Sequence, residues 1–426
     1  MEQLRISKRT RSSGVINLPG SKSVSNRALL LAALASGTTR ITNLLRSDDT
    51  ERMLEALKSL GVSVAIQDGG TECTVTGLGQ TFAADSPMRI FLGNAGTAMR
   101  PLVAVLAASR GKFEMTGEPR MEERPLGPLL EALRSAGAVI ECLKNEGYPP
   151  LRITGRELSG GELEIDGTVS SQFITAVLMA APLMRNAVTL KIRGELISKP
   201  YIDITIDLMR KFGVSVANRD YREFYIASGQ RYVSPGEFLV EGDASGASYF
   251  LAMGAIAGRV QVTGVGRDSV QGDVAFTRVL RAMGAEVTVG DNYIECSSRG
   301  RLHGIDMDMN DIPDAAMTAV PLALYADSPT VIRNVGSWRV KETDRLDAMA
   351  NELRKLGVRA ETGPDWIRIC PGPVNSGVAI DTYRDHRMAM CFSLAAFLTE
   401  VVINDPGCVA KTFPDYFDRF DEIAGK

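Results

Sequence analysis

Two kinds of apolar pattern alternate along the whole chain. In the first kind, apolar residues recur three and four positions apart among charged ones and a glycine follows, as in residues 54–62, LEALKSLGV. This spacing predicts an amphipathic helix that ends at a glycine in the left-handed conformation. The same pattern returns before five further glycines: Gly137, Gly213, Gly284, Gly357 and Gly425.

The second kind of pattern is apolar on nearly every side. Its six copies are residues 25–37, 97–111, 171–186, 246–258, 314–328 and 386–400. Such segments predict helices buried inside a domain, and a run of β-branched residues follows most of them. Twelve helices in strict alternation therefore predict an α/β chain of six repeats, each of about 71 residues.

The phase of the repeat predicts how the chain is divided. The chain ends after an amphipathic helix, whereas residues 3–7 and 14–18 have the pattern of strands that should follow such a helix. We therefore expect the first 20 residues to complete the last repeat. The predicted domains are residues 1–20 with 241–426, and residues 21–240. No Pro- or Ser-rich linker separates them, so the crossovers near Gly20 and Glu241 should be tight.

Composition narrows the class of protein. The 426 residues carry 48 Lys and Arg against 51 Asp and Glu, a net charge of −3, which argues against a general nucleic-acid binder. The apolar runs, such as residues 28–35, fall well short of the roughly 20 residues of a membrane span, and no secretory signal is visible. Six cysteines without a metal-ligand spacing predict reduced thiols in the cytoplasm. Two histidines are too few for a His-rich metal site.

The loops that precede the buried helices carry small hydroxyls, amides and basic side chains. The richest are residues 20–27, 93–100, 167–172 and 383–387. Helix capping alone accounts for single residues such as Ser170, Ser245 and Asp314. It does not account for Lys22, Arg27, Arg384 and Arg387, because a cation near a helix start opposes the helix dipole. An anionic ligand would resolve that conflict.

The loops before the amphipathic helices add Arg124, Lys341, Arg345 and Lys411. A single charged loop is usually a solvated surface, but equivalent loops of repeated units should converge. Convergent cations predict a substrate with phosphate and carboxylate groups. The run GSKS at residues 20–23 lacks the spacing of a Walker A motif, and no GxGxxG opens a helix. A nucleotide kinase and a dinucleotide enzyme are both disfavoured.

Seven segments resemble the 5-enolpyruvylshikimate-3-phosphate synthase family, also called 3-phosphoshikimate 1-carboxyvinyltransferases. They run in order from about Pro19 to Phe417: LPGSKSVSNRALLLAALA, LGNAGTAMRPL, EPRMEERP, DGTVSSQF, WRVKETDRL, DHRMAM and KTFPDYF. The resemblance implies an α/β fold of two similar domains, each a pseudo-threefold, inside-out barrel of three βαβαββ-type repeats. It also implies an active site in the cleft between the domains.

The resemblance further implies a reaction of aromatic amino-acid and chorismate biosynthesis, the shikimate pathway. The enolpyruvyl group of phosphoenolpyruvate would pass to the 5-hydroxyl of shikimate 3-phosphate, and phosphate would leave through a tetrahedral intermediate. No metal or other cofactor, nucleic acid or membrane is implied, and we expect a cytoplasmic monomer. The run around Gly96, with Thr97 and Pro101, resembles the glyphosate-sensitive class, so glyphosate should compete with phosphoenolpyruvate.

The matching positions assign site residues by similarity. Shikimate 3-phosphate would be held by Ser23, Arg27, Ser170, Ser171, Gln172, Ser198, Tyr201, Asp314 and Lys341. Phosphoenolpyruvate would be held by Lys22, Gly96, Arg124, Arg345, Arg387 and Lys411. Asp314 matches the family's general base, Glu342 or Lys22 could protonate the methylene carbon, and Lys22, Arg124 and Lys411 could stabilise the leaving phosphate.

One position departs from the family pattern. Ser337 stands where the family often has Asn, two residues before Arg339-Val340-Lys341. A hydroxyl is shorter than an amide, so we expect a weaker or water-mediated substrate contact at Ser337.

Two alternatives remain open from the sequence. A sister enzyme on the same fold transfers enolpyruvyl to UDP-N-acetylglucosamine, but it usually carries a reactive Cys in the loop that corresponds to residues 118–125, and this loop has none. A ring or clamp protein that encircles DNA would also be pseudo-sixfold. Salt-sensitive DNA binding without phosphate release would favour that alternative.

Overall fold

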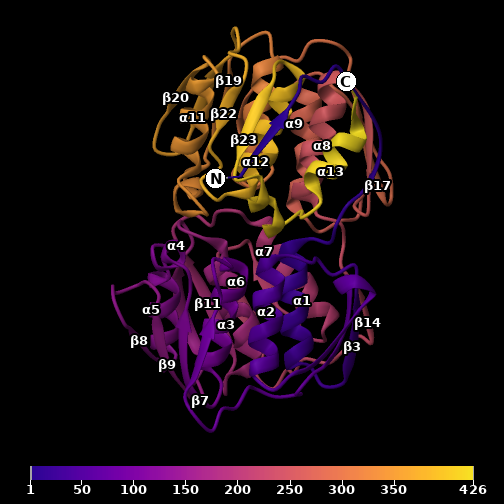
Figure 1. Cartoon of the computed structure of the whole chain (residues 1–426). Coiled ribbons are helices and arrows are strands. Elements are labelled where there is room, and N and C mark those ends of the chain that lie inside the picture. The colour runs from indigo at the N-terminus through magenta and orange to yellow at the C-terminus, as the bar shows by residue number, and fades with distance from the viewer. Residues whose placement is uncertain (1, 426) are drawn as a thin grey trace. The chain divides into compact units, whose positions relative to one another are not determined.

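The computed structural model describes residues 2–425 and divides the chain into two compact units (Figure 1). One unit is Met1–Pro19 with Glu241–Lys426, and the other is Gly20–Val240. We refer to them as the terminal unit and the central unit. Each is an α/β structure of three sheets and of helices from three repeats.

The central unit has three four-stranded sheets built on one plan. In strand order they are β14 (Glu237–Leu239), β3 (Thr38–Thr42), β5 (Glu72–Thr76) and β4 (Ser63–Gln67); then β6 (Met88–Phe91), β7 (Gly111–Thr116), β9 (Leu151–Gly155) and β8 (Val139–Cys142); then β10 (Gly161–Asp166), β11 (Val188–Arg193), β13 (Glu223–Ile226) and β12 (Ala217–Arg219). In each sheet the first two strands are parallel and the other two continue the sheet antiparallel.

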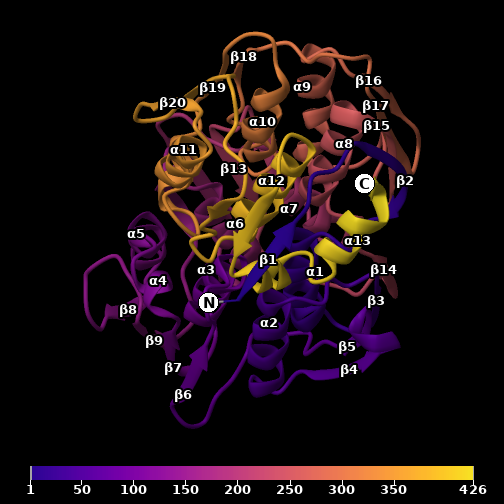
Figure 2. The same cartoon turned by 45° about the horizontal axis from the view of Figure 1, so that its top comes forward.

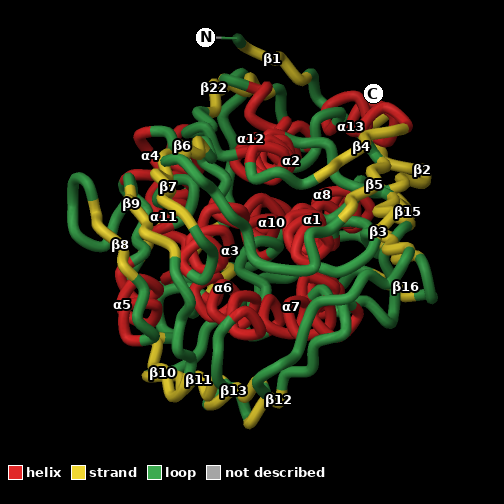
Figure 3. The backbone as a smooth tube through the Cα atoms, turned by 90° about the horizontal axis from the view of Figure 1, so that it is seen from below, coloured by secondary structure: helices red, strands yellow, loops and turns green. Residues whose placement is uncertain are grey.

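The helices of the central unit follow the predicted alternation. The buried helices are α1 (Lys22–Leu34), α3 (Gly96–Ala107) and α6 (Ser171–Ala180), and the amphipathic ones are α2 (Asp48–Ser59), α5 (Gly127–Ser135) and α7 (Pro200–Lys211); a short α4 (Pro119–Glu122) precedes α5. In α1 every residue except Ser23 is buried. Figure 3 shows β3, β5, β6–β9 and β10–β13 around the outside of α1, α3, α6 and α7. The helices therefore form the apolar core of the unit, and the sheets cover it.

The terminal unit repeats the plan with the N-terminal segment included. Its sheets are β16 (Glu286–Val289), β17 (Tyr293–Ser297), β15 (Gly258–Thr263), β2 (Arg11–Asn17) and β24 (Ala424–Gly425); then β18 (Asp306–Asp308), β19 (Thr330–Arg333), β21 (Ile367–Cys370) and β20 (Arg359–Thr362); then β1 (Gln3–Ile6), β23 (Val401–Asn404) and β22 (Val378–Ile380). Its buried helices are α8 (Ala244–Ala257), α10 (Ala316–Leu322) and α12 (His386–Ser393), and its amphipathic ones are α9 (Phe276–Ala282), α11 (Arg345–Lys355) and α13 (Tyr416–Ile423).

The first strands of the chain are completed by partners from its other end. β2 lies parallel to β15 and antiparallel to β24, and β1 pairs with β23. Figure 2 shows β1 and β2, in indigo, beside the orange and yellow elements of this unit. The repeat phase predicted this exchange, because the strands missing after the last helix stand at the start of the chain.

Helix ends confirm most of the glycine pattern and correct one position. Gly61, Gly137, Gly213, Gly284 and Gly357 all have positive φ angles, from 83° to 99°. The prediction for Gly425 is wrong: it lies in β24, opposite Arg11. A Cβ there would come within 2.6 Å of the Arg11 side chain, so this glycine serves close strand pairing rather than a left-handed turn.

Short 3₁₀ segments connect several elements. They are η1 (Asp68–Gly70), η2 (Ala181–Leu183), η3 (Gly272–Ala275), η4 (Ala323–Tyr325), η5 (Gly336–Val340), η6 (Leu394–Phe397) and η7 (Pro406–Lys411). Two of them bear on the site: Ser337 lies within η5, which leads directly into Lys341, and η7 ends at Lys411.

Candidate active site

Arg27 lies in the first turns of α1 and is buried among neutral oxygen atoms. Its Nε donates to Thr205 Oγ1 at 2.9 Å and its Nη2 to Thr175 Oγ1 at 3.2 Å, while Nη1 reaches the carbonyl of Ser23 at 2.9 Å. Burial lowers the pKa of Arg27 to about 10. The charge therefore remains at neutral pH, but none of these hydrogen-bond partners is an anion. A bound anion would stabilise it.

Lys22 is the first residue of α1 and only 8% exposed. Its Nζ lies 3.7 Å from a carboxylate oxygen of Asp49, at the start of α2. Asn26 donates to Thr97 Oγ1 at 2.7 Å, which ties α1 to the start of α3. Lys22 therefore belongs to a set of helix starts that are joined by side-chain contacts within one unit.

Gly96 begins α3 beside two guanidinium groups. A Cβ at this position would lie 2.1 Å from Arg100 Nη1 and 2.8 Å from Arg124 Nη2. Arg124 donates from Nη1 to the backbone and side-chain oxygens of Asn94, at 3.1 and 2.9 Å, while its buried Nε finds no acceptor among residues 2–425. The glycine thus makes room for two cations, one of which keeps a donor available.

The other predicted side chains of the central unit lie at the starts of α6 and α7. Ser170 caps α6 by accepting from the Gln172 backbone at 3.3 Å, and Ser171 is the first residue of that helix. The buried Gln172 Oε1 accepts no hydrogen bond within the described chain. Ser198 is buried with a left-handed φ of 53°, and the Tyr201 carbonyl accepts from Arg27 and Thr205. Arg27 therefore links these helix starts to Ser23 in α1.

Asp314 holds two arginines in the terminal unit. Its Oδ1 accepts from Arg345 Nη1 and its Oδ2 from Arg387 Nη2, both at 2.9 Å. Burial alone would raise the pKa of Asp314, but Arg387, Lys341 and Arg345 outweigh it and hold that pKa well below its usual range. In this arrangement Asp314 is ionised and a weak proton acceptor.

Arg345 is only 1% exposed and faces three carboxylates. Besides Asp314, it donates from Nη2 to Glu342 at 2.9 Å and from Nε to Asp385 at 2.7 Å. Burial opposes its charge, yet Asp385, Glu342 and Asp314 together raise the pKa of Arg345 above its usual range. Asp385 also caps α12 by accepting from the Arg387 backbone at 2.9 Å.

Arg387 has a further neutral partner that the sequence did not reveal. Its Nη1 donates to the buried Tyr249 hydroxyl in α8 at 3.1 Å. Burial raises the pKa of this tyrosine well above its usual range, so the hydroxyl stays neutral. The guanidinium is thus fixed from two sides, by Tyr249 and by Asp314.

The segment that carries Ser337 and Lys341 is anchored on both sides. Trp338 is fully buried and donates from Nε1 to the Pro313 carbonyl at 2.6 Å, beside Asp314. Arg339 donates to the carbonyls of Gly363 and Pro364 at the tip of the β20–β21 hairpin. Lys341 lies close enough to Asp314 to lower its pKa, whereas Ser337 is half-buried and makes no hydrogen bond within the described chain.

Asp273 is a buried carboxyl that sequence reasoning missed. It accepts a short hydrogen bond from Ser245 Oγ, next to Asp243, which caps α8. Burial, and then the negative charge of Asp314, raise the pKa of Asp273 to about 7. No repeat counterpart marks this position, so only its packing reveals it.

Each unit therefore gathers its own set of predicted residues. The central unit joins Lys22, Arg27 and the helix starts around them, and the terminal unit joins Asp314, Glu342, Arg345 and Arg387. Lys411 ends η7 and is 8% exposed. Among residues 2–425 no group of three His, Cys, Asp or Glu side chains is arranged to hold a metal ion. Within the same residues, no helix is long and apolar enough to cross a membrane.

The fold and the two residue sets define an α/β protein of repeated units whose helix starts carry anion-binding groups. Residues 6–420 match the family model described as EPSP synthase (3-phosphoshikimate 1-carboxyvinyltransferase). The chain belongs to this family of transferases.

Similar proteins extend over the full length of the chain. It is 60% identical over 425 residues to the 3-phosphoshikimate 1-carboxyvinyltransferase of Tolumonas auensis, and each chain is covered completely. The enzyme of that name from Shewanella amazonensis is 61% identical over 427 residues, covering 100% of this chain and 99% of the relative.

Solved structures agree on the fold. The EPSP synthase of Acinetobacter baumannii matches with a TM-score of 0.84 and 28% identity, covering 100% of this chain and 98% of that one. The enolpyruvyl transferase NikO of Streptomyces tendae matches with a TM-score of 0.79 at 18% identity, covering 100% and 98%, which shows a shared fold. The resemblance found in the sequence is confirmed. The family match supports the shikimate 3-phosphate reaction over the UDP-N-acetylglucosamine alternative.

Proposed function

We propose that this chain transfers the enolpyruvyl group of phosphoenolpyruvate to the 5-hydroxyl of shikimate 3-phosphate and releases inorganic phosphate. One observation carries the proposal: Asp314 is buried between Arg345 and Arg387, two guanidinium groups of the kind that bind a carboxylate with two hydrogen bonds. A substrate carboxylate can replace Asp314 as the acceptor for both.

That replacement gives Asp314 its proposed catalytic role. While both arginines donate to it, its pKa stays far below neutrality and it accepts protons poorly. When the carboxylate of phosphoenolpyruvate takes up Arg345 and Arg387, fewer cations face Asp314 and its pKa rises. It then takes the proton of the attacking 5-hydroxyl, a transfer that contributes typically about 10²- to 10⁴-fold to the rate.

The central unit supplies the proposed binding site for shikimate 3-phosphate. Arg27 is a buried cation that hydrogen-bonds only to neutral oxygens, so it gains most from a dianionic phosphate or a carboxylate. Hydroxyls and amides at the neighbouring helix starts suit the phosphate and the ring hydroxyls. These residues are Ser23, Ser170, Ser171, Gln172, Ser198 and Tyr201. From the terminal unit, Lys341 and Asp314 would complete the set, with Ser337 making a weaker contact.

The phosphate of phosphoenolpyruvate needs cations that stay charged as it leaves. Lys22 and Arg124 of the central unit and Lys411 of the terminal unit are buried cations at helix or 3₁₀ ends that suit this task. Glu342 or Lys22 would deliver the proton to the methylene carbon. Both units are required in this proposal, because neither contains all of the residues.

Glyphosate sensitivity follows from the same placement. Glyphosate carries phosphonate and carboxylate groups, so it would compete with phosphoenolpyruvate for Arg124 and its neighbours beside Gly96. We further propose that the enzyme acts as a cytoplasmic monomer.

A phosphate-release assay with each substrate omitted in turn tests the proposal. Release should require both shikimate 3-phosphate and phosphoenolpyruvate, and UDP-N-acetylglucosamine should not replace the former. The variant Asp314→Asn should lose release, while Asp306→Asn, which removes a surface partner of Arg333, should retain it. No release from the wild-type protein with both substrates present would contradict the proposal.

A further inference from the structure

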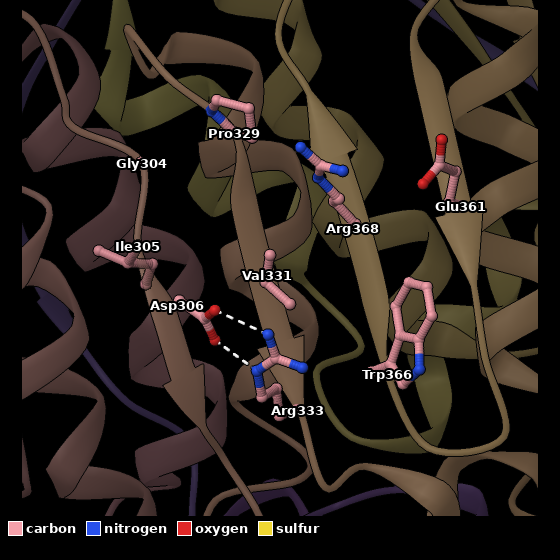
Figure 4. A pocket seen from close by; sticks show the side chains of 9 residues that line it. All are labelled: Gly304, Ile305, Asp306, Pro329, Val331, Arg333, Glu361, Trp366 and Arg368. Atoms are coloured by element: carbon pink, nitrogen blue, oxygen red, sulfur yellow. Dashed lines mark hydrogen bonds and ion pairs between the residues drawn. The ribbon is translucent and has the colours of Figure 1, made fainter.

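The outward face of the β18–β19–β21–β20 sheet has a groove of about 550 Å³ that no proposed substrate residue lines (Figure 4). Its floor is a row of four residues in register across the strands: Asp306, Val331, Arg368 and Glu361. The groove belongs wholly to the terminal unit. Its volume falls within the range of small-molecule sites.

The equivalent row in the central unit shows what is unusual about this one. On the β6–β7–β9–β8 sheet the row reads Arg89, Glu114, Arg152 and Glu141, with charges that alternate across the sheet. Arg152 donates to Glu141 at 2.9 Å, and Glu114 lies 3.5 Å from Arg89. Each cation of this row is thus paired with a carboxylate on a neighbouring strand, as is usual for stabilising cross-strand pairs.

In the groove the same row is interrupted at its second position. Val331 stands where the other sheet has Glu114, so Arg368 lacks a carboxylate on that side. On its other side Glu361 is in register, but this carboxylate accepts from Arg359 instead, at 2.6 and 3.0 Å. Arg368 forms no hydrogen bond or ion pair within residues 2–425.

The groove has apolar surfaces next to this cation. In Figure 4 the Arg368 guanidinium leans toward β19, above Val331, and Trp366 stands at the opposite end of the groove. The indole packs across Gly363, where a Cβ would lie 2.1 Å from its Nε1, so the ring is fixed in place. Pro329 completes an apolar surface around Val331.

We infer that this groove binds a small aromatic carboxylate: its carboxylate would pair with Arg368, and its ring would lie over Val331 toward Trp366. A flat ring suits the indole face and the valine, and a single negative charge supplies the partner that Glu114 supplies on the other sheet. Arg333 is already held by both oxygens of Asp306, at 2.6 and 2.8 Å, so it positions the groove wall rather than the charge.

Benzoate is the probe that tests this inference on the full chain. We expect a dissociation constant of about 1 to 10 mM, as befits so small a molecule, measured by ligand-observed NMR and by quenching of Trp366 fluorescence. The only other tryptophan, Trp338, is fully buried. Benzamide, which lacks the charge, and acetate, which lacks the ring, should each bind at least about tenfold more weakly.

Matched variants distinguish this groove from other cationic sites on the protein. Arg368→Gln removes the partner and Val331→Glu supplies an internal one, so each should weaken benzoate binding by about tenfold. Arg152→Gln, at the equivalent place in the paired row, should leave the dissociation constant within about twofold. Equal binding by wild type and Arg368→Gln, or by benzoate and benzamide, would overturn the inference. The readout is binding alone, so the result does not depend on the proposed enzymatic activity.

Discussion

The buried arginines of the two units differ in what surrounds them. Arg27 in the central unit donates to threonine hydroxyls and backbone carbonyls, and its pKa falls to about 10 because burial is not offset by a negative charge. Arg345 in the terminal unit is equally buried, but three carboxylates raise its pKa above the usual range. A cation among neutral oxygens attracts an anionic ligand, whereas a cation among carboxylates controls their protonation.

This contrast assigns different tasks to the two residue sets. The central unit would mainly bind anions, and the terminal unit would mainly set the protonation of its carboxylates. The predictions below test that division, starting from the largest expected effect.

The largest effect should come from Asp314→Asn. The amide keeps the shape of the side chain but cannot take a proton, so kcat should fall by about 10²- to 10⁴-fold while the KM for shikimate 3-phosphate changes much less. Steady-state phosphate release measures both constants. Asp306→Asn serves as the control, because it breaks an arginine pair on the outward sheet face of the same unit. Unchanged turnover in Asp314→Asn would remove this residue as the base.

Arg27→Gln should act mainly on binding. Loss of a charged donor to a substrate anion corresponds to a roughly 10- to 100-fold rise in the KM for shikimate 3-phosphate. The same assay, with shikimate 3-phosphate varied at saturating phosphoenolpyruvate, gives this value. Arg40→Gln, which removes a surface pair with Glu72, should leave KM unchanged. A fall in kcat at constant KM would show that Arg27 serves chemistry instead of binding.

Gly96→Ala should have a more selective effect. The new Cβ would collide with the guanidinium groups of Arg100 and Arg124, and their displacement should weaken glyphosate inhibition by about tenfold. The KM for phosphoenolpyruvate should rise as well. Inhibition curves at fixed phosphoenolpyruvate measure the change, with Gly372→Ala as control because its Cβ would meet open space. Inhibition that does not change in Gly96→Ala would show that the inhibitor binds elsewhere.

The smallest effect concerns stability and pH at Asp273. Its pKa is raised by burial to about 7 in the folded protein from the model value of 3.8, so the folded state holds the proton more tightly. This carboxyl therefore favours folding least above pH 7, and its contribution declines as pH rises from about 4 to 7.

Asp273→Asn removes that decline. Relative to wild type, its melting temperature should increase between pH 5 and pH 8 by a few degrees, about 2 to 4 °C for each kcal/mol. Thermal unfolding at the two pH values measures the change. Asp306→Asn should show no such increase, because an arginine partner lowers rather than raises the pKa of Asp306. A constant difference between Asp273→Asn and wild type would contradict the raised pKa.

Much of the fold could be predicted because its signals are local. Helix periodicity and the terminal glycines identified twelve helices, and the phase of the repeat predicted that β2 joins β15. Gly425 failed because its role depends on Arg11, at the other end of the chain. A glycine needed for close strand pairing and a glycine needed for a left-handed turn look alike in a sequence.

The site could be predicted only in part, for the same reason. The excess of cations at helix starts identified Arg27, Arg345 and Arg387, but not their partners. Asp314 meets Arg387 across 73 positions, and only the packing of the repeats brings them together. Asp273 and Tyr249 gave no signal, because a buried acid or tyrosine resembles an ordinary surface or core residue until its neighbours are known.

Calorimetric titration of shikimate 3-phosphate into two variants tests the division between the units most directly. We predict that Asp314→Asn binds this substrate within a few-fold of wild type although its turnover is lost, and that Arg27→Gln binds it at least about tenfold more weakly. If Asp314→Asn lost binding as severely as Arg27→Gln, the division of binding and proton chemistry between the two units would be wrong.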